Sequence, residues 1–300
     1  MKFLSRIFSL IVLILITESA EAQGFKNNVT QYKIKLISEA SSLIGSEDVL
    51  STDEMKPQFK RKGYAPVDVD LKSMKKRKLS PAKIYERVSV ATVIVSPAGR
   101  CNEVTDRGAC KRIHTYPASG YIIDSSGIIV TNYHVVNSYI SKYNKDARDV
   151  FVVMLKDGTS FPVQEILMAD KSEDLAVIRI DPKGTELPVL PVATKDAEIG
   201  DPVYIVSHPK GYFYAFSSGM VTDKFSEINA SNYRNLMAIS ADYAAGSSGA
   251  AIIDESGNVI GTVSYTKTFQ HSGDETKTQM VLKATIPSSS LLRLINEGNL

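Results

Sequence analysis

Three short segments, in the order His, Asp, Ser, constrain this chain most, because each adjoins a run of residues typical of a β-strand. Residues 131–136 contain His134, Asp174 opens the second segment, and residues 246–250 contain Ser248. A serine hydroxyl is a weak nucleophile unless an imidazole accepts its proton, and that imidazole needs a carboxylate to fix its tautomer. The three residue types therefore suggest a nucleophile, a base and an orienting acid.

The residues around the first two segments predict buried strands. Residues 118–130 form two apolar runs separated by a Ser-Ser-Gly turn, which predicts strand, turn, strand, with His134 just past the second strand on a loop. Asp174 directly precedes the β-branched run 175–180, which is typical of a buried strand. A carboxylate at that point is either a structural aspartate or the group that orients the histidine.

The segment around Ser248 is the most specific of the three. Gly246 and Gly249 allow a tight turn that exposes the hydroxyl and leaves backbone amides free. We expect the amides of residues 246–248 (Gly246, Ser247 and Ser248) to form an oxyanion hole, above all those of Gly246 and Ser248. Each donor in such a hole contributes roughly 10²–10³ in rate. Alone, this segment would more often be a flexible loop. The other histidines, His114, His208 and His271, are expected to be non-catalytic.

On these segments the chain resembles the trypsin-like serine proteases, and within them the HtrA-like bacterial branch. The resemblance covers roughly residues 82–297. It implies an all-β fold of two six-stranded antiparallel β-barrels, with the active site between them and a short C-terminal helix starting near Ser288. Further matching stretches are residues 84–88, 119–127, 170–177, 200–211, 218–221 and 284–287.

The resemblance implies that His134 and Asp174 come from the first barrel and Ser248 from the second. It also implies polypeptide substrates and neither a metal nor an organic cofactor. Ser247 stands where zymogen-type relatives carry an aspartate that pairs with a freshly cut N-terminus, so activation by N-terminal insertion is not expected. Ala250 replaces the usual second glycine. The chain ends too soon after Ser248 for the PDZ domain that many HtrA proteins append, and we expect none.

The resemblance also suggests substrate-binding residues. Ser264, Tyr265 and Thr266 would lie on the strand that pairs with an extended peptide. Thr266 replaces a glycine that keeps the specificity pocket open, which favours small or medium aliphatic groups at the cleaved position. Asp242 has the offset from Ser248 of the pocket aspartate in enzymes that cut after Lys or Arg. HtrA-like relatives carry a structural aspartate in this loop, and we favour that role while keeping the other open.

The N-terminus predicts export. Lys2 and Arg6 precede an apolar core of residues 7–16, and a small-x-small site follows at residues 20–22. We interpret residues 1–22 as a secretory signal peptide, with an uncleaved anchor as the alternative, although about ten apolar residues are few for a bilayer span. The mature protein is expected in the periplasm or outside the cell, without membrane attachment.

In an exported protein, Cys101 and Cys110 are expected to form a disulfide that closes a ten-residue loop and stabilises a surface hairpin. The entropic contribution of so short a loop is roughly 2–3 kcal/mol. With two cysteines and no histidine pair at ligand spacing, no metal site is expected.

Residues 23–80 differ from the predicted protease domain, residues 81–300. Residues 23–79 carry 12 Lys or Arg and 7 Asp or Glu, a net charge of +5, and residues 31–43 show helical periodicity. Because the remainder has few core-forming residues, we expect a mobile basic extension ending in a linker. A pro-segment cut near Lys78, or attachment to an anionic surface, are alternatives. The whole chain has a net charge of only +2, which gives no support to nucleic-acid binding.

The sequence therefore predicts an exported serine endopeptidase that acts in protein quality control or degrades secreted proteins. A catalytically silent peptide-binding or chaperone module on the same fold is the alternative. A third possibility is a latent protease that residues 23–80 hold inactive. The sequence makes no prediction of the oligomeric state.

Overall fold

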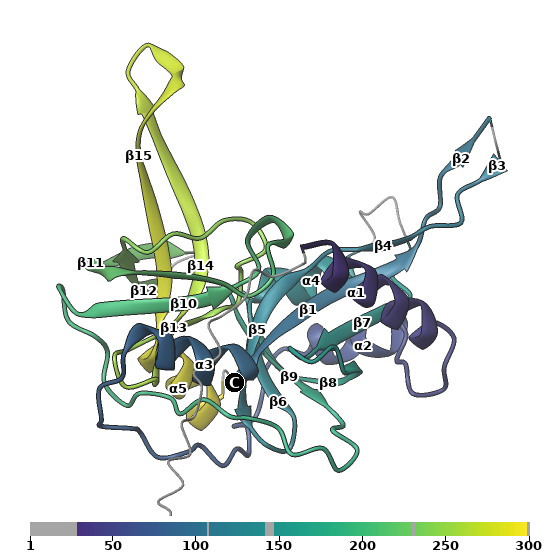
Figure 1. The fold of residues 1–300 in the computed structure, drawn as a ribbon, viewed down its shortest axis with the longest axis horizontal. Helices are drawn as coiled ribbons and strands as arrows, with labels where there is room; N and C mark the ends of the chain where they lie inside the picture. The colour runs from purple at the N-terminus through teal and green to yellow at the C-terminus, as the bar shows by residue number, and fades with distance from the viewer. Residues whose placement is uncertain (1–28, 107, 142–146, 230–231, 299–300) are drawn as a thin grey trace, which may run out of the picture.

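The computed structural model describes residues 29–298, apart from residues 107, 142–146 and 230–231. The predicted signal peptide, residues 1–22, therefore lies outside the described residues. Two antiparallel barrels lie side by side, with helices packed around them (Figure 1). No helix in the described ranges is both long and apolar enough to cross a bilayer.

Six strands close the first barrel, in the order β1-β5-β6-β9-β8-β7, because β1 pairs with β7 as well as with β5. A seventh strand, β4 (Ile113–Thr115), pairs with the far end of β1. The barrel strands are β1 (Thr92–Arg100), β5 (Ala118–Asp124), β6 (Ile128–Thr131), β7 (Val150–Met154), β8 (Ser160–Asp170) and β9 (Leu175–Ile180).

The second barrel is a closed six-stranded ring in the order β10-β11-β12-β15-β14-β13. Beyond the ring, β14 and β15 continue as a hairpin that projects from the body of the molecule (Figure 1). The strands are β10 (Pro202–Ser207), β11 (Ala215–Asn229), β12 (Asn232–Ile239), β13 (Ala251–Ile253), β14 (Val259–His271) and β15 (Asp274–Pro287), with the short 3₁₀ helix η1 (Pro209–Gly211) after β10. The expected two-barrel, all-β architecture is confirmed.

The C-terminal helix, expected near Ser288, is α5 (Ser288–Glu297). Leu291, Leu294 and Ile295 follow helical spacing and are buried, so one face of α5 packs on the second barrel beside β14 and β15. Burial of each such side chain contributes about 1.5–3 kcal/mol. The helix is therefore held by its packing rather than by its sequence propensity alone.

The N-terminal segment packs on the barrels, which differs from the expected mobile extension. It contains α1 (Val29–Leu43) and α2 (Thr52–Phe59), and α3 (Pro81–Ala91) follows. Leu36 and Ala40 of α1 are fully buried, as are Met55 and Tyr64, and α1 contacts β4, β1 and β7. These four apolar side chains are enough to hold the segment in place, because the first barrel supplies the rest of the hydrophobic core against which they pack. The boundary at residue 81 stays a prediction.

Between α2 and α3 the chain runs extended and is bonded to both barrels. The Asp70 amide donates to Asp124 Oδ2 at 2.6 Å in the first barrel, and the Lys75 amide donates to Asn258 Oδ1 at 2.6 Å in the second. The Val67 amide donates to the Ile295 carbonyl of α5 at 2.8 Å. This segment therefore links the two barrels along their outer surface.

A two-stranded hairpin of β2 (Val104–Thr105) and β3 (Gly108–Ala109) lies between the cysteines and projects from the first barrel (Figure 1). The surface hairpin expected in this loop is thus present.

Candidate active site

His134 lies in the first turn of a helix, α4 (Tyr133–Ile140), and not on a loop as expected. Val135 and Val136 are buried together with Tyr139 and Ile140, four residues further along. This spacing of apolar pairs is the helical signal that a strand-and-loop interpretation missed. Because α4 starts directly after β6, it presents His134 at the rim of the first barrel.

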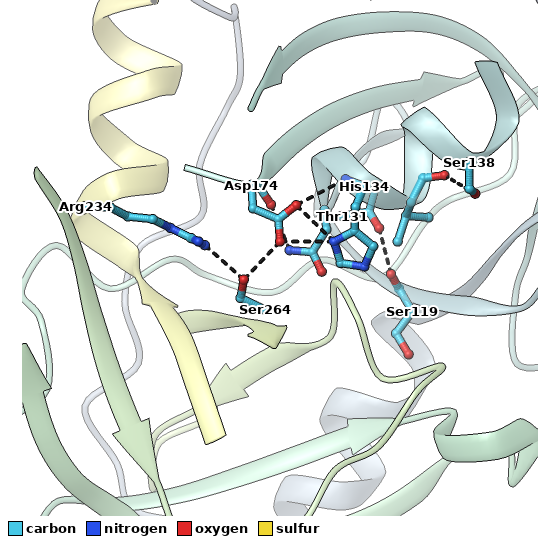
Figure 2. A network of polar contacts seen from close by, with 9 residues as sticks. Ser119, Thr131, His134, Ser138, Asp174, Arg234 and Ser264 are labelled. Carbon is cyan, nitrogen blue, oxygen red and sulfur yellow. Dashed lines mark hydrogen bonds and ion pairs between the residues drawn. The ribbon is translucent and has the colours of Figure 1, made fainter. Parts of the chain in front are cut away.

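The His134 ring is paired with Asp174, which follows β8 and precedes β9 (Figure 2). Nδ1 lies 3.0 Å from Oδ1 and 3.1 Å from Oδ2, and the His134 amide donates to Oδ1 at 3.1 Å. The His134 side chain is 49% exposed, whereas that of Asp174 is only 17% exposed. The carboxylate thus fixes the imidazole from its protected side and leaves Nε2 available.

Asp174 has a backbone conformation that non-glycine residues rarely adopt, with φ of 56°. Strain of this kind costs on the order of 1–3 kcal/mol. Two hydrogen bonds to its carbonyl hold it there: the Asn132 side-chain amide donates at 2.9 Å and the Tyr133 amide at 3.2 Å. Residues next to His134 therefore fix the peptide that aims the carboxylate at the ring.

Ser264 and Arg234 complete the network behind Asp174 (Figure 2). The Ser264 hydroxyl donates to Asp174 Oδ2 at 2.9 Å, and Arg234 Nη2 of β12 donates to the Ser264 oxygen at 2.9 Å. The pairing of β14 with β15 is irregular between Val263 and Tyr265, so a bulge lies at Ser264. The Ser264 side chain, expected at the substrate, thus belongs to the histidine–aspartate network. Sequence reasoning did not identify Arg234.

The turn that carries Ser248 packs against the segment before His134. A side chain on Gly249 would place its Cβ 2.3 Å from the Ser119 carbonyl oxygen and 2.4 Å from Thr131 Oγ1. The Ser119 amide donates to the Ser248 carbonyl at 2.9 Å. Among the described residues, no hydrogen bond joins the His134 ring to the Ser248 hydroxyl, but catalytic hydrogen bonds are often long before substrate binds.

Of the three backbone amides expected to form an oxyanion hole, two remain as candidate donors. The Ser247 amide donates to the Ala244 carbonyl at 2.9 Å, so the expectation for Ser247 is corrected. Its hydroxyl is buried and accepts from Ser207 Oγ at 2.9 Å. Within the described ranges, the amides of Gly246 and Ser248 have no acceptor. Gly246 has φ of 98°, and a Cβ there would lie 2.4 Å from the His208 carbonyl, so only glycine fits.

Comparisons with known proteins show what the chain as a whole resembles. Residues 118–261 match the family described as trypsin-like peptidase domain. The chain is 32% identical over 161 residues to Protease Do-like 5, chloroplastic, of Arabidopsis thaliana, covering 52% of this chain and 50% of that protein. It is 31% identical over 182 residues to a probable periplasmic serine endoprotease, DegP-like, of Brucella suis, covering 60% and 33%.

Residues 118–261 thus match a trypsin-like peptidase domain, and the relatives that the chain resembles are Do-like and DegP-like serine proteases. Its fold is also similar to that of the HtrA-type protease AlgW with a decapeptide, with a TM-score of 0.57 at 21% identity over 72% of this chain and 66% of that one. The chain spans half or less of the length of these two curated relatives.

The other residues expected to bind substrate, Asp242, Tyr265 and Thr266, are half-buried or exposed. The Asp242 side chain is 89% exposed and forms an ion pair with Lys283. The Tyr265 hydroxyl donates to Glu227 Oε1 at 2.5 Å, and its carbonyl accepts from the Tyr243 hydroxyl at 2.8 Å. Thr266 is exposed. The Asp242 carboxylate therefore lies at the surface and not at the base of an enclosed pocket.

His208 has a structural role in the domain. It is fully buried, its Nδ1 accepts from the Tyr214 amide at 3.1 Å, and its Nε2 lies 3.2 Å from the Val93 carbonyl of β1. It therefore bridges the loop after β10 to the first barrel. His271 lies on the exposed hairpin.

Cys101 and Cys110 are free thiols in this structure, which differs from the expected disulfide. Arg112 Nε donates to Cys110 Sγ at 3.4 Å. This hydrogen bond first, and then those with Cys101 and the Arg112 backbone, lower the pKa of Cys110 to about 7. Because β4 returns antiparallel to β1, the ligand atoms of His114 and both cysteines lie within 4.8 Å of one another. Sequence spacing did not predict this cluster. Three donors are one fewer than a structural zinc site uses, so the cluster alone is an incomplete set.

Proposed function

We propose that the chain is an exported serine endopeptidase that hydrolyses polypeptides through an acyl intermediate on Ser248. The observation that carries the proposal is the His134–Asp174 pair, held at 3.0 Å and backed by Ser264, next to a glycine-flanked serine turn. This arrangement supplies a base of fixed tautomer and a nucleophile on segments that contact each other.

The proposed mechanism uses these side chains and two amides. Ser248 Oγ attacks the scissile carbonyl carbon while His134 Nε2 accepts its proton, and Asp174 stabilises the imidazolium that forms. The oxyanion accepts hydrogen bonds from the amides of Gly246 and Ser248. His134 then gives its proton to the leaving amine. A water molecule, deprotonated by the same histidine, hydrolyses the acyl-enzyme and frees Ser248.

The predicted signal peptide and the probable periplasmic DegP-like relative of Brucella suis support action outside the cytoplasm, in quality control or degradation of exported proteins. We infer that in such an oxidising compartment Cys101 and Cys110 form a disulfide, since their sulfur atoms already lie within 4.8 Å.

Hydrolysis of casein by the Ser248→Ala variant tests the proposal. Turnover should fall by about 10⁶ without a change in folding, because the nucleophile acts as a unit with its base. Ser226→Ala, the same change on the second barrel at a side chain that contacts Asn235, is the control and should retain full activity. Residual hydrolysis by Ser248→Ala at the wild-type rate would end the assignment.

The alternative function, a silent peptide-binding or chaperone module, is favoured by one observation: the described residues show no hydrogen bond between His134 and Ser248. A silent module would bind unfolded casein but leave it intact, in wild type and Ser248→Ala alike.

A further inference from the structure

A pocket of about 440 Å³ opens beside the nucleophile turn. It lies between the loop after β4, the region of η1 and the N-terminal helix α1. Its lining includes Ala245, Gly246, Tyr116, Phe213, Lys210 and Lys33. Because Gly246 is a proposed oxyanion donor, the pocket adjoins the position of the scissile carbonyl.

Helix α1 supplies one wall of this pocket and is fixed in place. Its Leu36 is fully buried, and its Tyr32 ring lies 5.7 Å from the Phe213 ring. The Tyr32 hydroxyl also donates to the Lys156 carbonyl at 2.9 Å. Lys33, the next residue of α1, is therefore presented to the pocket by a packed helix rather than by a loose tail.

The charged side chains that line the pocket are all basic. Lys33 and Lys210 each bring an ammonium group, and no acidic side chain is among the described residues that line it. A neighbouring hollow of about 400 Å³ shares Lys33 and Tyr116 and adds Arg112. The Arg148 guanidinium lies 4.2 Å from the centre of the Tyr116 ring. A groove of uniformly positive charge thus leads from the nucleophile turn along β4 and under α1.

The position of the groove indicates which half of a substrate it receives. The acyl half is expected along residues 263–266 of β14, and none of these residues lines either hollow. The two halves of an extended peptide leave the scissile carbonyl in opposite directions. A groove that adjoins Gly246 away from β14 therefore faces the leaving-group half.

We propose that this groove binds the leaving-group side of the substrate and selects polypeptides with acidic residues just after the cleaved bond. Lys33, from outside the predicted protease domain, is a specificity-determining residue for that selection. This inference rests on the proposed function, because it assigns the groove to the substrate of the same site.

Two quenched fluorescent peptides test the selection. They are identical except that the second and third residues after the cleaved bond are both Asp in one and both Asn in the other. Because exposed ion pairs are weak, kcat/KM should favour the Asp peptide only modestly, by roughly three- to tenfold. Lys33→Glu should remove that preference. Lys35→Glu makes the same charge change on α1 outside the pocket lining and should keep the wild-type preference.

The outcomes separate the two proposals. Equal cleavage of both peptides by wild type would overturn the acidic selection while the endopeptidase assignment stands, and so would a preference that Lys33→Glu retains. If neither peptide is cleaved, binding of a labelled peptide that begins Ala-Asp-Asp is compared with Ala-Asn-Asn by fluorescence polarisation. Tighter binding of the acidic peptide that Lys33→Glu abolishes would support the groove while the proposed function fails. Equal binding would overturn the groove as well.

Discussion

The contacts of Ser264 in the structure differ from the role that its sequence position suggested. Its position on β14 suggested contact with substrate, but its hydroxyl bonds to Asp174, and Arg234 bonds to the same oxygen. The bulge at Ser264 causes the change, because it turns the side chain toward the first barrel. Such bulges depend on strand register, which one sequence does not reveal.

We therefore expect Ser264→Ala to lower kcat by roughly tenfold with KM little changed. A hydrogen bond to a charged group is worth about 1.5–3 kcal/mol, and its loss frees one oxygen of Asp174 to turn from the imidazole. Steady-state kinetics on a chromogenic peptide measures this. Thermal unfolding by circular dichroism serves as the control, and it should shift little. An unchanged kcat would show that Asp174 is positioned without Ser264.

A second prediction at the scale of residues concerns the alkylation of Cys101 and Cys110. Protein isolated from an oxidising compartment should resist alkylation at Cys101 and Cys110 until a reductant is added. After reduction, the alkylation rate of Cys110 should rise with pH around a midpoint near 7, since Arg112 stabilises its thiolate. Arg112→Ala should move that midpoint upward, whereas Arg100→Ala, at a residue paired with Asp149, should not. Alkylation without reductant would contradict the disulfide.

At the scale of elements, the sequence predicted the strands before His134 and after Asp174, because β5, β6 and β9 are short apolar runs next to turn residues. The sequence also predicted that Asp174 directly precedes β9. The helix α4 did not, because two apolar pairs after a strand resemble a continued strand. The packing of α1 and α2 was missed because each helix supplies only part of a core that the first barrel completes.

Phe59 of α2 illustrates that shared core. Its ring stacks on Tyr133 with centroids 4.7 Å apart, next to His134, and it is 6% exposed. Phe59→Ala should lower the free energy of unfolding by about 3–5 kcal/mol, because a large buried ring leaves a cavity. Urea denaturation measures it. Phe269→Ala, on the exposed hairpin, should cost less than about 1 kcal/mol. Equal effects would mean that α2 is not docked.

At the scale of the whole molecule, residues 64–79 connect the barrels, and Asp124 anchors this segment. Burial raises the pKa of Asp124, but hydrogen bonds from Ser126 and from the Asp70 amide together outweigh burial and lower it. A folded-state pKa below the unfolded value means that the carboxylate stabilises the fold above about pH 4 and that this contribution is lost as the pH falls through the folded pKa.

The Asp124→Asn variant should therefore be less stable than wild type by about 1–2 kcal/mol at pH 7. The difference between the two proteins should shrink as the pH falls through the folded-state pKa of Asp124, which lies below the ordinary value, because there the wild-type carboxyl also becomes neutral. Urea denaturation at pH 7 and at about pH 2, well below the ordinary pKa of a carboxyl, measures both differences. A gap of the same size at both pH values would show that the charge of Asp124 does not hold the segment.

We propose that the two barrels of the molecule bring a serine and an oriented histidine together into one nucleophilic site. Reaction with a fluorophosphonate probe, followed by peptide mass spectrometry, tests it directly, because such probes modify serines activated by a neighbouring base. We expect a single modified residue, Ser248, in wild type, and no modification in His134→Ala. An unlabelled wild-type protein, or equal labelling of the His134→Ala variant, would contradict it.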